Sequence, residues 1–268
     1  MSAEFFHALE VTVWLSLFGA PLGCFIVFRR LSFLGDALSH ATLSGVAVAS
    51  LLFGLNFLAL SLGAVVAALT THLLLQYFER SWKLTPDLAL TVSYSGLFGL
   101  GLFLLSRQGQ SLEHFLVGDI RSANDEALNF LRLWTLIVIG TISFFWKPLW
   151  LGAVDPVLAR SLGYSRWSTQ SILVVLMAVS VVGMMQTVGV VLVATYLVFP
   201  AVTAMPWVRS LSGLLLGSLL SALVASGVGL WIWSLDPSYR SAPVFSLSAF
   251  CLFILSHVSR WTLRPRLE

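Results

Sequence analysis

Apolar stretches of about 20 residues recur along this chain, and short polar segments separate them. Such a stretch, coiled into an α-helix, spans the roughly 30 Å core of a lipid bilayer and satisfies its own backbone hydrogen bonds there. The sequence is 58% hydrophobic and 10% charged, and its mean hydropathy of +0.92 lies outside the range of water-soluble domains. We therefore predict an all-α, polytopic transmembrane helical bundle of about eight to nine spans.

The apolar segments divide into nine expected helices, which form a single transmembrane domain over residues 1–268. Their ranges are 10–28, 34–53, 57–78, 88–106, 127–146, 168–185, 187–206, 210–234 and 243–259. Two short segments must meet in a tight turn around Met184–Thr187; one tilted helix or a re-entrant pair there would change the orientation of everything that follows. The N-terminal MSAEFFHALE lacks the basic start of a signal peptide, so we expect the first helix to remain in the protein.

The basic residues predict the orientation of the bundle. If the loop after Arg29 is cytoplasmic, alternation places all but four of the 15 Lys and Arg residues inside; the four are Arg107, Arg121, Arg132 and Arg240. This bias follows the positive-inside rule and predicts an external N-terminus and a cytoplasmic tail. Basic residues at membrane boundaries give no reason to expect a nucleic-acid partner, and tryptophans near the helix ends are typical of anchors in membrane lipid.

Small residues recur at every fourth position on two of the expected helices. One series is Ala37, Ala41, Gly45 and Ala49, and the other is Gly213, Gly217, Ser221, Ala225 and Gly229. Small side chains let helix backbones approach closely, which favours association within lipid. We expect both series to pack within the chain rather than against a second copy.

Several catalytic motifs are absent from the sequence. There is no G-x-x-x-x-G-K-[ST] phosphate loop and no H-E-x-x-H zinc motif, so this chain is not expected to hydrolyse ATP or to be a zinc protease of that pattern. Ser95 in SYSG and His257 leave open an intramembrane serine protease, although serine is also an ordinary packing residue in membrane helices.

Asp36 and His40, in LGDALSHA, are the most informative ionisable residues. Positions i and i+4 share one face of a helix, so the two side chains can meet one cation or one proton, and Ser44 continues that face. Ionisable groups near the membrane usually face a bundle interior or a water-filled path. The alternative is structural: the two residues bond each other, or Asp36 caps the start of its helix after Gly35.

Two ligands do not make a selective metal site, so other groups must complete it. His72 and Asp87 are weaker candidates, because threonines can satisfy His72 and Asp87 suits the N-terminus of a helix after Pro86. Glu113 and His114 lie together in an expected outer loop, where a solvated role is the default.

Residues 147–167 form the longest expected cytoplasmic loop. Its DPVLARSLGY core predicts a short helix with Asp155 as cap, Pro156 in the first turn and Gly163 after the last turn. Such a helix can dock a partner or simply lie at the interface.

Five segments carry a resemblance to a known family. RRLSFLGDALSHATLSGVAVA, LTPDLALTVSYSGLFGLGLFLLS, EHFLVGDI, VDPVLARSLG and TVGVVLVATYLVFPAVTA resemble, in order and spacing, segments of the permease subunits of ABC importers for zinc, manganese or iron. The resemblance covers nearly the whole chain.

The resemblance implies a homodimer in a bacterial plasma membrane, working with ABC ATPase subunits and an extracytoplasmic metal-binding protein. The chain itself would be a transport subunit without catalytic activity or a permanent cofactor, and its cargo a divalent metal cation. Asp36 and His40 match family positions near the translocation path. Residues 154–164 match the segment that couples to the ATPase, and within it we single out Asp155, Pro156, Ala159, Leu162 and Gly163.

Four positions in three places depart from the family pattern: Ser44 replaces a usual proline, Ala153 and Val154 replace a Ser-Phe pair, and Pro86 stands where an acid is frequent. The sequence thus predicts a metal-importing ABC permease, for zinc or manganese first and iron next. A proton-coupled carrier without an ATPase, using Asp36 and His40 as a relay, is the alternative from another class.

Overall fold

The computed structural model describes residues 3–29, 32–54, 56–107, 120, 125–164, 166–236 and 238–263. Regular structure in these ranges is helical: α1 Ala3–Phe28, α2 Ser32–Phe53, α3 Phe57–Ser81, α4 Pro86–Arg107, α6 Asp125–Phe144, α7 Trp146–Val154, α8 Pro156–Ser161, α9 Arg166–Val188, α10 Val190–Ala204, the 3-10 helix η2 Met205–Trp207, α11 Leu211–Leu235 and α12 Ser241–Leu263. The predicted all-α bundle is confirmed.

The nine predicted apolar segments all correspond to helices. Seven described helices, α1 to α4, α6, α11 and α12, are long and apolar enough to cross a membrane, and shorter apolar stretches lie in α9 (Ser171–Met185) and from α10 into η2 (Val191–Trp207). The break in the middle falls later than predicted. It lies at Gly189, whose φ of +80° is a left-handed value that glycine adopts without strain.

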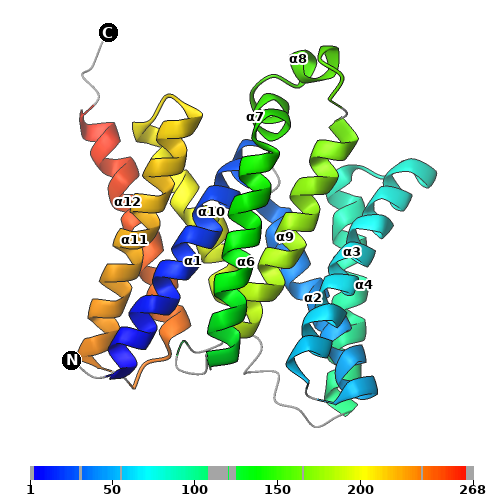
Figure 1. Ribbon diagram of the computed structural model, residues 1–268, viewed down its shortest axis with the longest axis horizontal. Helices are drawn as coiled ribbons and strands as arrows, with labels where there is room; N and C mark the ends of the chain where they lie inside the picture. Colours follow the sequence, from blue (N-terminus) through cyan, green and yellow to red (C-terminus); the bar gives the residue numbers. More distant parts are fainter. Residues whose placement is uncertain are drawn as a thin grey trace.

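Figure 1 shows how the helices are arranged. Helices α2, α3 and α4 form one side of the molecule, α10, α11 and α12 form the other, and α1, α6 and α9 lie between them. The start of α1 and the end of α12 lie at opposite ends of the bundle, and α7 and α8 lie at the end where α12 finishes. This arrangement agrees with placing residues 147–167 and the tail on the same side of the membrane; that this side is the cytoplasm stays a prediction from the basic residues.

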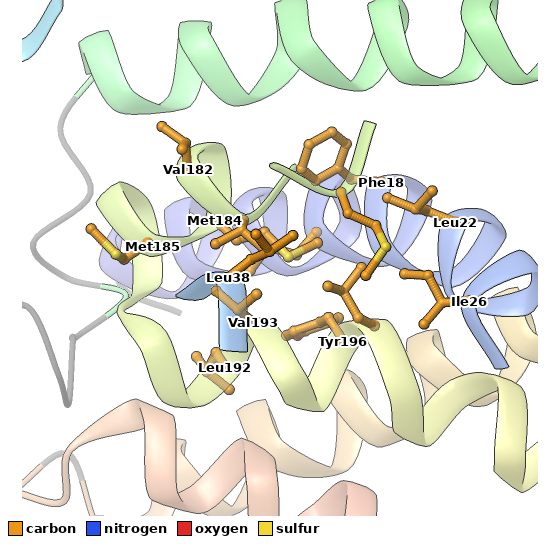
Figure 2. Close-up of a cluster of buried hydrophobic side chains, with 14 of the residues drawn as sticks. Phe18, Leu22, Ile26, Leu38, Val182, Met184, Met185, Leu192, Val193 and Tyr196 are labelled. Atoms are coloured by element: carbon orange, nitrogen blue, oxygen red, sulfur yellow. The ribbon is translucent and has the colours of Figure 1, made fainter. Parts of the chain in front are cut away.

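The hydrophobic core lies where α1, α2, α9 and α10 meet. Figure 2 shows Phe18 of α1, Leu38 of α2, Met184 of α9 and Tyr196 of α10 in one cluster. Leu38 is fully buried and stands two positions from both Asp36 and His40, so it points to the other side of α2. The core therefore anchors α2 by the face opposite its ionisable side chains.

The predicted small-residue series pack within the chain. A Cβ on Gly45 would lie 1.9 Å from the carbonyl oxygen of Gly63, so α2 and α3 are in backbone contact at that point. In α11, the hydroxyl of Ser221 donates to the carbonyl of Pro200 in α10, and Gly229 lies against Phe245 of α12. Close backbone approach is what small residues provide in lipid.

The segment expected to be a long loop, 147–167, is more ordered than predicted. Its first part is helix α7, which begins at Trp146 directly after a turn at Phe145, and a short helix α8 follows. Sequence reasoning missed α7 because its apolar residues, WKPLWLGAV, look like a continuation of α6.

Candidate functional site

Asp36 and His40 lie on one face of α2, as the spacing predicts. The imidazole Nε2 of His40 is 3.7 Å from the carboxylate Oδ1 of Asp36. The side chains are 45% exposed for Asp36 and 29% exposed for His40, so both remain reachable from one side. The other ring nitrogen of His40, Nδ1, is shielded from solvent and has no hydrogen-bond partner. The two side chains are therefore close without a hydrogen bond between these two atoms, and the exposed part of the pair includes carboxylate oxygen and the Nε2 side of the imidazole.

Aromatic side chains of α4 border this pair. The ring of Phe98 lies 5.0 Å from the His40 ring, centroid to centroid, and Phe33 meets Tyr94 edge-on at 5.9 Å. Tyr94 and Phe98 are one helical turn apart, so α4 covers the site with consecutive rings of the same face. These rings restrict the imidazole on one side while the carboxylate stays partly open.

Ser44 does not extend the open face, contrary to the prediction from its spacing. It is buried, and its hydroxyl donates to the carbonyl of Ala41 at 2.8 Å. A Cβ on Gly101 would lie 2.7 Å from the Ser44 backbone nitrogen, so α4 crosses directly over this turn of α2. The contact between the two helices closes the face one turn beyond His40.

The weaker candidates stay apart from the pair. His72 is buried in α3, and its Nε2 contacts the side-chain nitrogen of Gln76, whereas Thr71 donates to the carbonyl of Ala67. The expected threonine partners of His72 were therefore wrong. Asp87 is exposed in the first turn of α4, which suits the helix N-terminus. Glu113 and His114 lie outside the described residues.

Within the described ranges, no group of three or more His, Cys, Asp or Glu side chains is placed to hold a metal ion. Asp36 and His40 offer one oxygen and one nitrogen ligand type, which zinc, manganese and iron all accept. One copy of the chain therefore presents part of a coordination shell, and a cation held there would need ligands from water or from another chain.

A separate apolar groove of about 710 Å³ lies between α2, α3 and α4, and neither Asp36 nor His40 lines it. Its wall includes Ser44, Val48, Leu52, Leu62 and Leu100, several of them well exposed. The groove runs along the part of α2 that follows His40. It carries no charged side chain, so it offers no further ligands.

The predicted short helix in 147–167 has the expected caps. The side chain of Asp155 accepts from the backbone N–H groups of Val157 and Leu158, at 3.0 and 2.9 Å, and Pro156 occupies the first turn. Gly163 follows with a φ of +86°. Val157 and Leu162 are exposed at 71% and 57%, whereas Ala159 is buried, so α8 presents apolar side chains outward while Ala159 packs inward.

One ion pair escaped the sequence reasoning. Arg132 of α6 donates to the carboxylate of Glu10 in α1, and it also donates to the side chain of Asn129 at 2.9 Å. The signal was present in the sequence: two opposite charges stand near the starts of apolar helices, each about two turns in. The pair joins α1 to α6, and it gives the Glu10 carboxylate an opposite charge inside an otherwise apolar stretch of α1.

Ser95 and His257 are not brought together. Ser95 is exposed on α4, and His257 is exposed on α12, where its Nδ1 lies 3.0 Å from the carbonyl of Phe253. The two helices lie on opposite sides of the molecule (Figure 1). This separation removes the serine protease reading.

Ionisable side chains that stay partly exposed on an apolar helix are typical of membrane proteins with an ion pathway. Comparison with known proteins is consistent with that class. A manganese import system permease protein, ScaB of Streptococcus parasanguinis, is 34% identical over 92% of this chain and 88% of its own length. A high-affinity zinc uptake system membrane protein, ZnuB of Haemophilus influenzae, is 29% identical over 95% and 97%.

A solved structure, PsaBC from Streptococcus pneumoniae in complex with Fab, contains a chain with a TM-score of 0.85 and 28% identity. The superposition covers 96% of this chain and 91% of that one. The family described as the ABC 3 transport family matches residues 1–260. The chain belongs to this family, and it is a multi-pass permease of the bacterial cell membrane.

Proposed function

We propose that this chain is the membrane subunit of an ATP-driven importer for a divalent transition metal, zinc or manganese first and iron next. The observation that carries the proposal is the Asp36–His40 pair, half exposed on a membrane helix and 3.7 Å apart. Ionisable side chains in such a position mark ion pathways. The names of the relatives, a manganese permease and a zinc permease, support the same class of cargo.

Transient, incomplete coordination suits a transport path. A site that supplied a full set of ligands would hold the ion too tightly to release it, whereas two ligands per chain give weaker binding. In a homodimer, a second Asp36 and His40 would double the number of ligands. The partly covered imidazole and the more open carboxylate would then bind and release the cation as the helices move.

The energy source would be a partner ATPase, since the sequence has no phosphate loop. Helix α8, with its exposed Val157 and with the exposed Leu162 directly after its last residue, is the proposed docking element. An extracytoplasmic binding protein would deliver the cation to the opposite end. ATP binding would displace α8, and the helices would rock to expose the path to one side and then to the other.

The test is uptake into vesicles that contain the permease with its ATPase, supplied with the binding protein and with zinc, manganese or iron. We expect uptake of at least one of these metals that requires ATP and survives a protonophore. Uptake that persists without the ATPase and collapses with the proton gradient would instead support the proton-coupled carrier.

The site is tested by Asp36→Asn and His40→Ala, each compared with His257→Ala, which alters an exposed histidine on α12. Loss of a charge-bearing ligand weakens such interactions by about 1.5–3 kcal/mol, which is roughly 10- to 100-fold. We expect that loss in uptake for both site variants, with normal amounts of assembled complex, and no loss for the control. Normal uptake in both would show that Asp36 and His40 are structural.

The docking role is tested by Asp155→Arg, which removes the α8 cap and adds a charge, against Arg240→Ala at the other end of the molecule. We expect the ATPase to co-purify less with Asp155→Arg and normally with the control. Full retention of the complex and of coupled uptake would overturn docking through this residue.

A further inference from the structure

The side chain of Arg29 lies against α7 at Gly152. Arg29 directly follows the last residue of α1, and a Cβ on Gly152 would lie 2.1 Å from its Nη2 atom and 3.5 Å from the hydroxyl of Thr169 in α9. The Nε and Nη2 atoms of Arg29 are shielded from solvent. Because Gly152 has no side chain, the guanidinium of Arg29 can lie directly against it, at the point where α1, α7 and α9 meet.

A second contact holds the other end of α7. Phe25, one turn before Arg29, is fully buried and meets Trp146, the first residue of α7, with ring centroids 6.0 Å apart and planes at 82°. Edge-to-face pairs of this kind favour a fixed mutual orientation. Helix α7 is thus held to α1 near its first residue and near its last turn.

Helix α7 is also continuous with α8. Asp155 alone separates them; its backbone N–H donates to Leu151 at 2.9 Å, and its side chain caps α8. Only residues 153–155 separate Gly152 from α8, and the bond from Asp155 to Leu151 ties them to α7. A displacement of α8 would therefore be felt at Gly152. Figure 1 shows α7 and α8 together at the end of the bundle where α1 ends and α9 begins.

Arg29 also lies close in sequence to α2, the helix that carries Asp36 and His40. Helix α2 begins at Ser32, three residues after Arg29, and Asp36 follows one turn later. Contacts thus connect α8 through α7 to Arg29, and Arg29 precedes Ser32, the first residue of α2, by three positions in the sequence. Such a series of contacts is a physical route for coupling between α8 and the start of α2.

We propose that Arg29 is a positioning residue that transmits displacement of α8 to α2 through its seat on Gly152. This inference rests on the proposed function, in which α8 meets an ATPase and α2 meets the cation. The proposal requires the planar guanidinium of arginine against Gly152. Orientation of the protein in the membrane, in contrast, requires only a positive charge at this position, which lysine also supplies.

The experiment uses Gly152→Ala, Arg29→Lys and the control Gly140→Ala, because a Cβ on Gly140 in α6 would meet nothing within 4 Å. Gly152→Ala displaces the end of a flexible side chain rather than backbone, so we expect it to fold. Each variant is purified with its ATPase, and three quantities are measured: the amount of complex, ATP hydrolysis, and uptake of manganese or zinc per ATP hydrolysed. Hydrogen exchange of residues 146–164 is measured on the permease alone.

We expect Gly152→Ala and Arg29→Lys to assemble with the ATPase and hydrolyse ATP normally, while uptake per ATP falls about tenfold. Exchange in α7 should rise in both variants and stay unchanged in Gly140→Ala. Normal uptake per ATP in both variants would overturn the proposal, as would a loss of uptake that merely parallels a loss of complex. Failure of the unaltered protein to show ATP-dependent uptake would instead defeat the proposed function, and the exchange result would still report on the Arg29 contact.

Discussion

Two groups of helices, α1 with α10 and α11, and α2 with α3 and α4, differ in how their buried polar side chains are bonded. Among α1, α10 and α11, buried hydroxyls bond one another: Tyr196 and Ser226 are 2.8 Å apart, and Ser226 and Ser16 are 3.3 Å apart. Among α2, α3 and α4, the ring nitrogens Nδ1 of both His40 and His72 have no hydrogen-bond partner. Buried polar groups normally find partners, so the exceptions need a reason.

This difference suggests two roles: α1, α10 and α11 form a rigid scaffold, and α2, α3 and α4 form the surface that meets the cargo. A fully bonded polar network fixes one arrangement of its helices, because any shift leaves a hydroxyl unsatisfied in an apolar interior. The α2–α4 side is held by backbone contact instead, as at Gly45 and Gly63, and keeps ligand atoms unused. We infer that the hydroxyl network fixes α1, α10 and α11 relative to one another, whereas the α2–α4 side interacts with the cargo.

The largest expected effect breaks the α2–α4 side. In Gly45→Val the new side chain would meet the carbonyl of Gly63, and backbone cannot move aside as a flexible side chain can. Overpacking of this kind costs about 3 kcal/mol, which corresponds to a fall of roughly 6 °C in Tm for a chain of this size. Thermal unfolding of the purified protein in detergent measures it.

The control for this variant is Gly99→Val in α4, where a Cβ would meet nothing within 4 Å. An equal loss of Tm in both variants would mean that valine is disfavoured at either position for reasons unrelated to the crossing of α2 and α3.

A smaller effect should sharpen the role of α4. In Phe98→Ala the ring that lies 5.0 Å from His40 is removed, and the imidazole gains freedom. Aromatic contacts of this kind are worth about 0.5–1.5 kcal/mol, so we expect metal uptake to fall about two- to tenfold. Uptake at a series of metal concentrations measures it.

Phe103→Ala, at a well exposed position of the same helix, is the matched control for Phe98→Ala. If Phe98→Ala transports at the normal rate while remaining folded, the ring only fills space and does not position the imidazole.

The sequence could predict only part of this region. Hydrophobic length gave the helices, and i,i+4 spacing placed Asp36 beside His40, because both depend on local geometry alone. The burial of Ser44 could not be foreseen, since it depends on where α4 crosses α2, a contact between segments more than 50 residues apart. The partner of His72 was missed although local geometry predicts it: Gln76 stands four residues on, on the same face of α3, whereas Thr70 and Thr71 face other directions.

The smallest expected effect tests the scaffold side. Tyr196→Phe removes the hydroxyl that bonds Ser226 and leaves the ring in the core shown in Figure 2. Losing one buried hydrogen bond costs about 1 kcal/mol, or roughly 2 °C in Tm. We expect metal uptake to be unchanged, because the bonds of this network join Tyr196, Ser226 and Ser16 and not Asp36 or His40. Thermal unfolding and uptake are measured on the same preparation.

Ser226→Ala should lower the free energy of unfolding by a similar amount, and the double variant by less than the sum of the two, since Tyr196 and Ser226 share one bond. A loss of uptake in Tyr196→Phe larger than that in Phe98→Ala would reverse the assignment of the two sides, because it would make the bonded network part of the moving machinery.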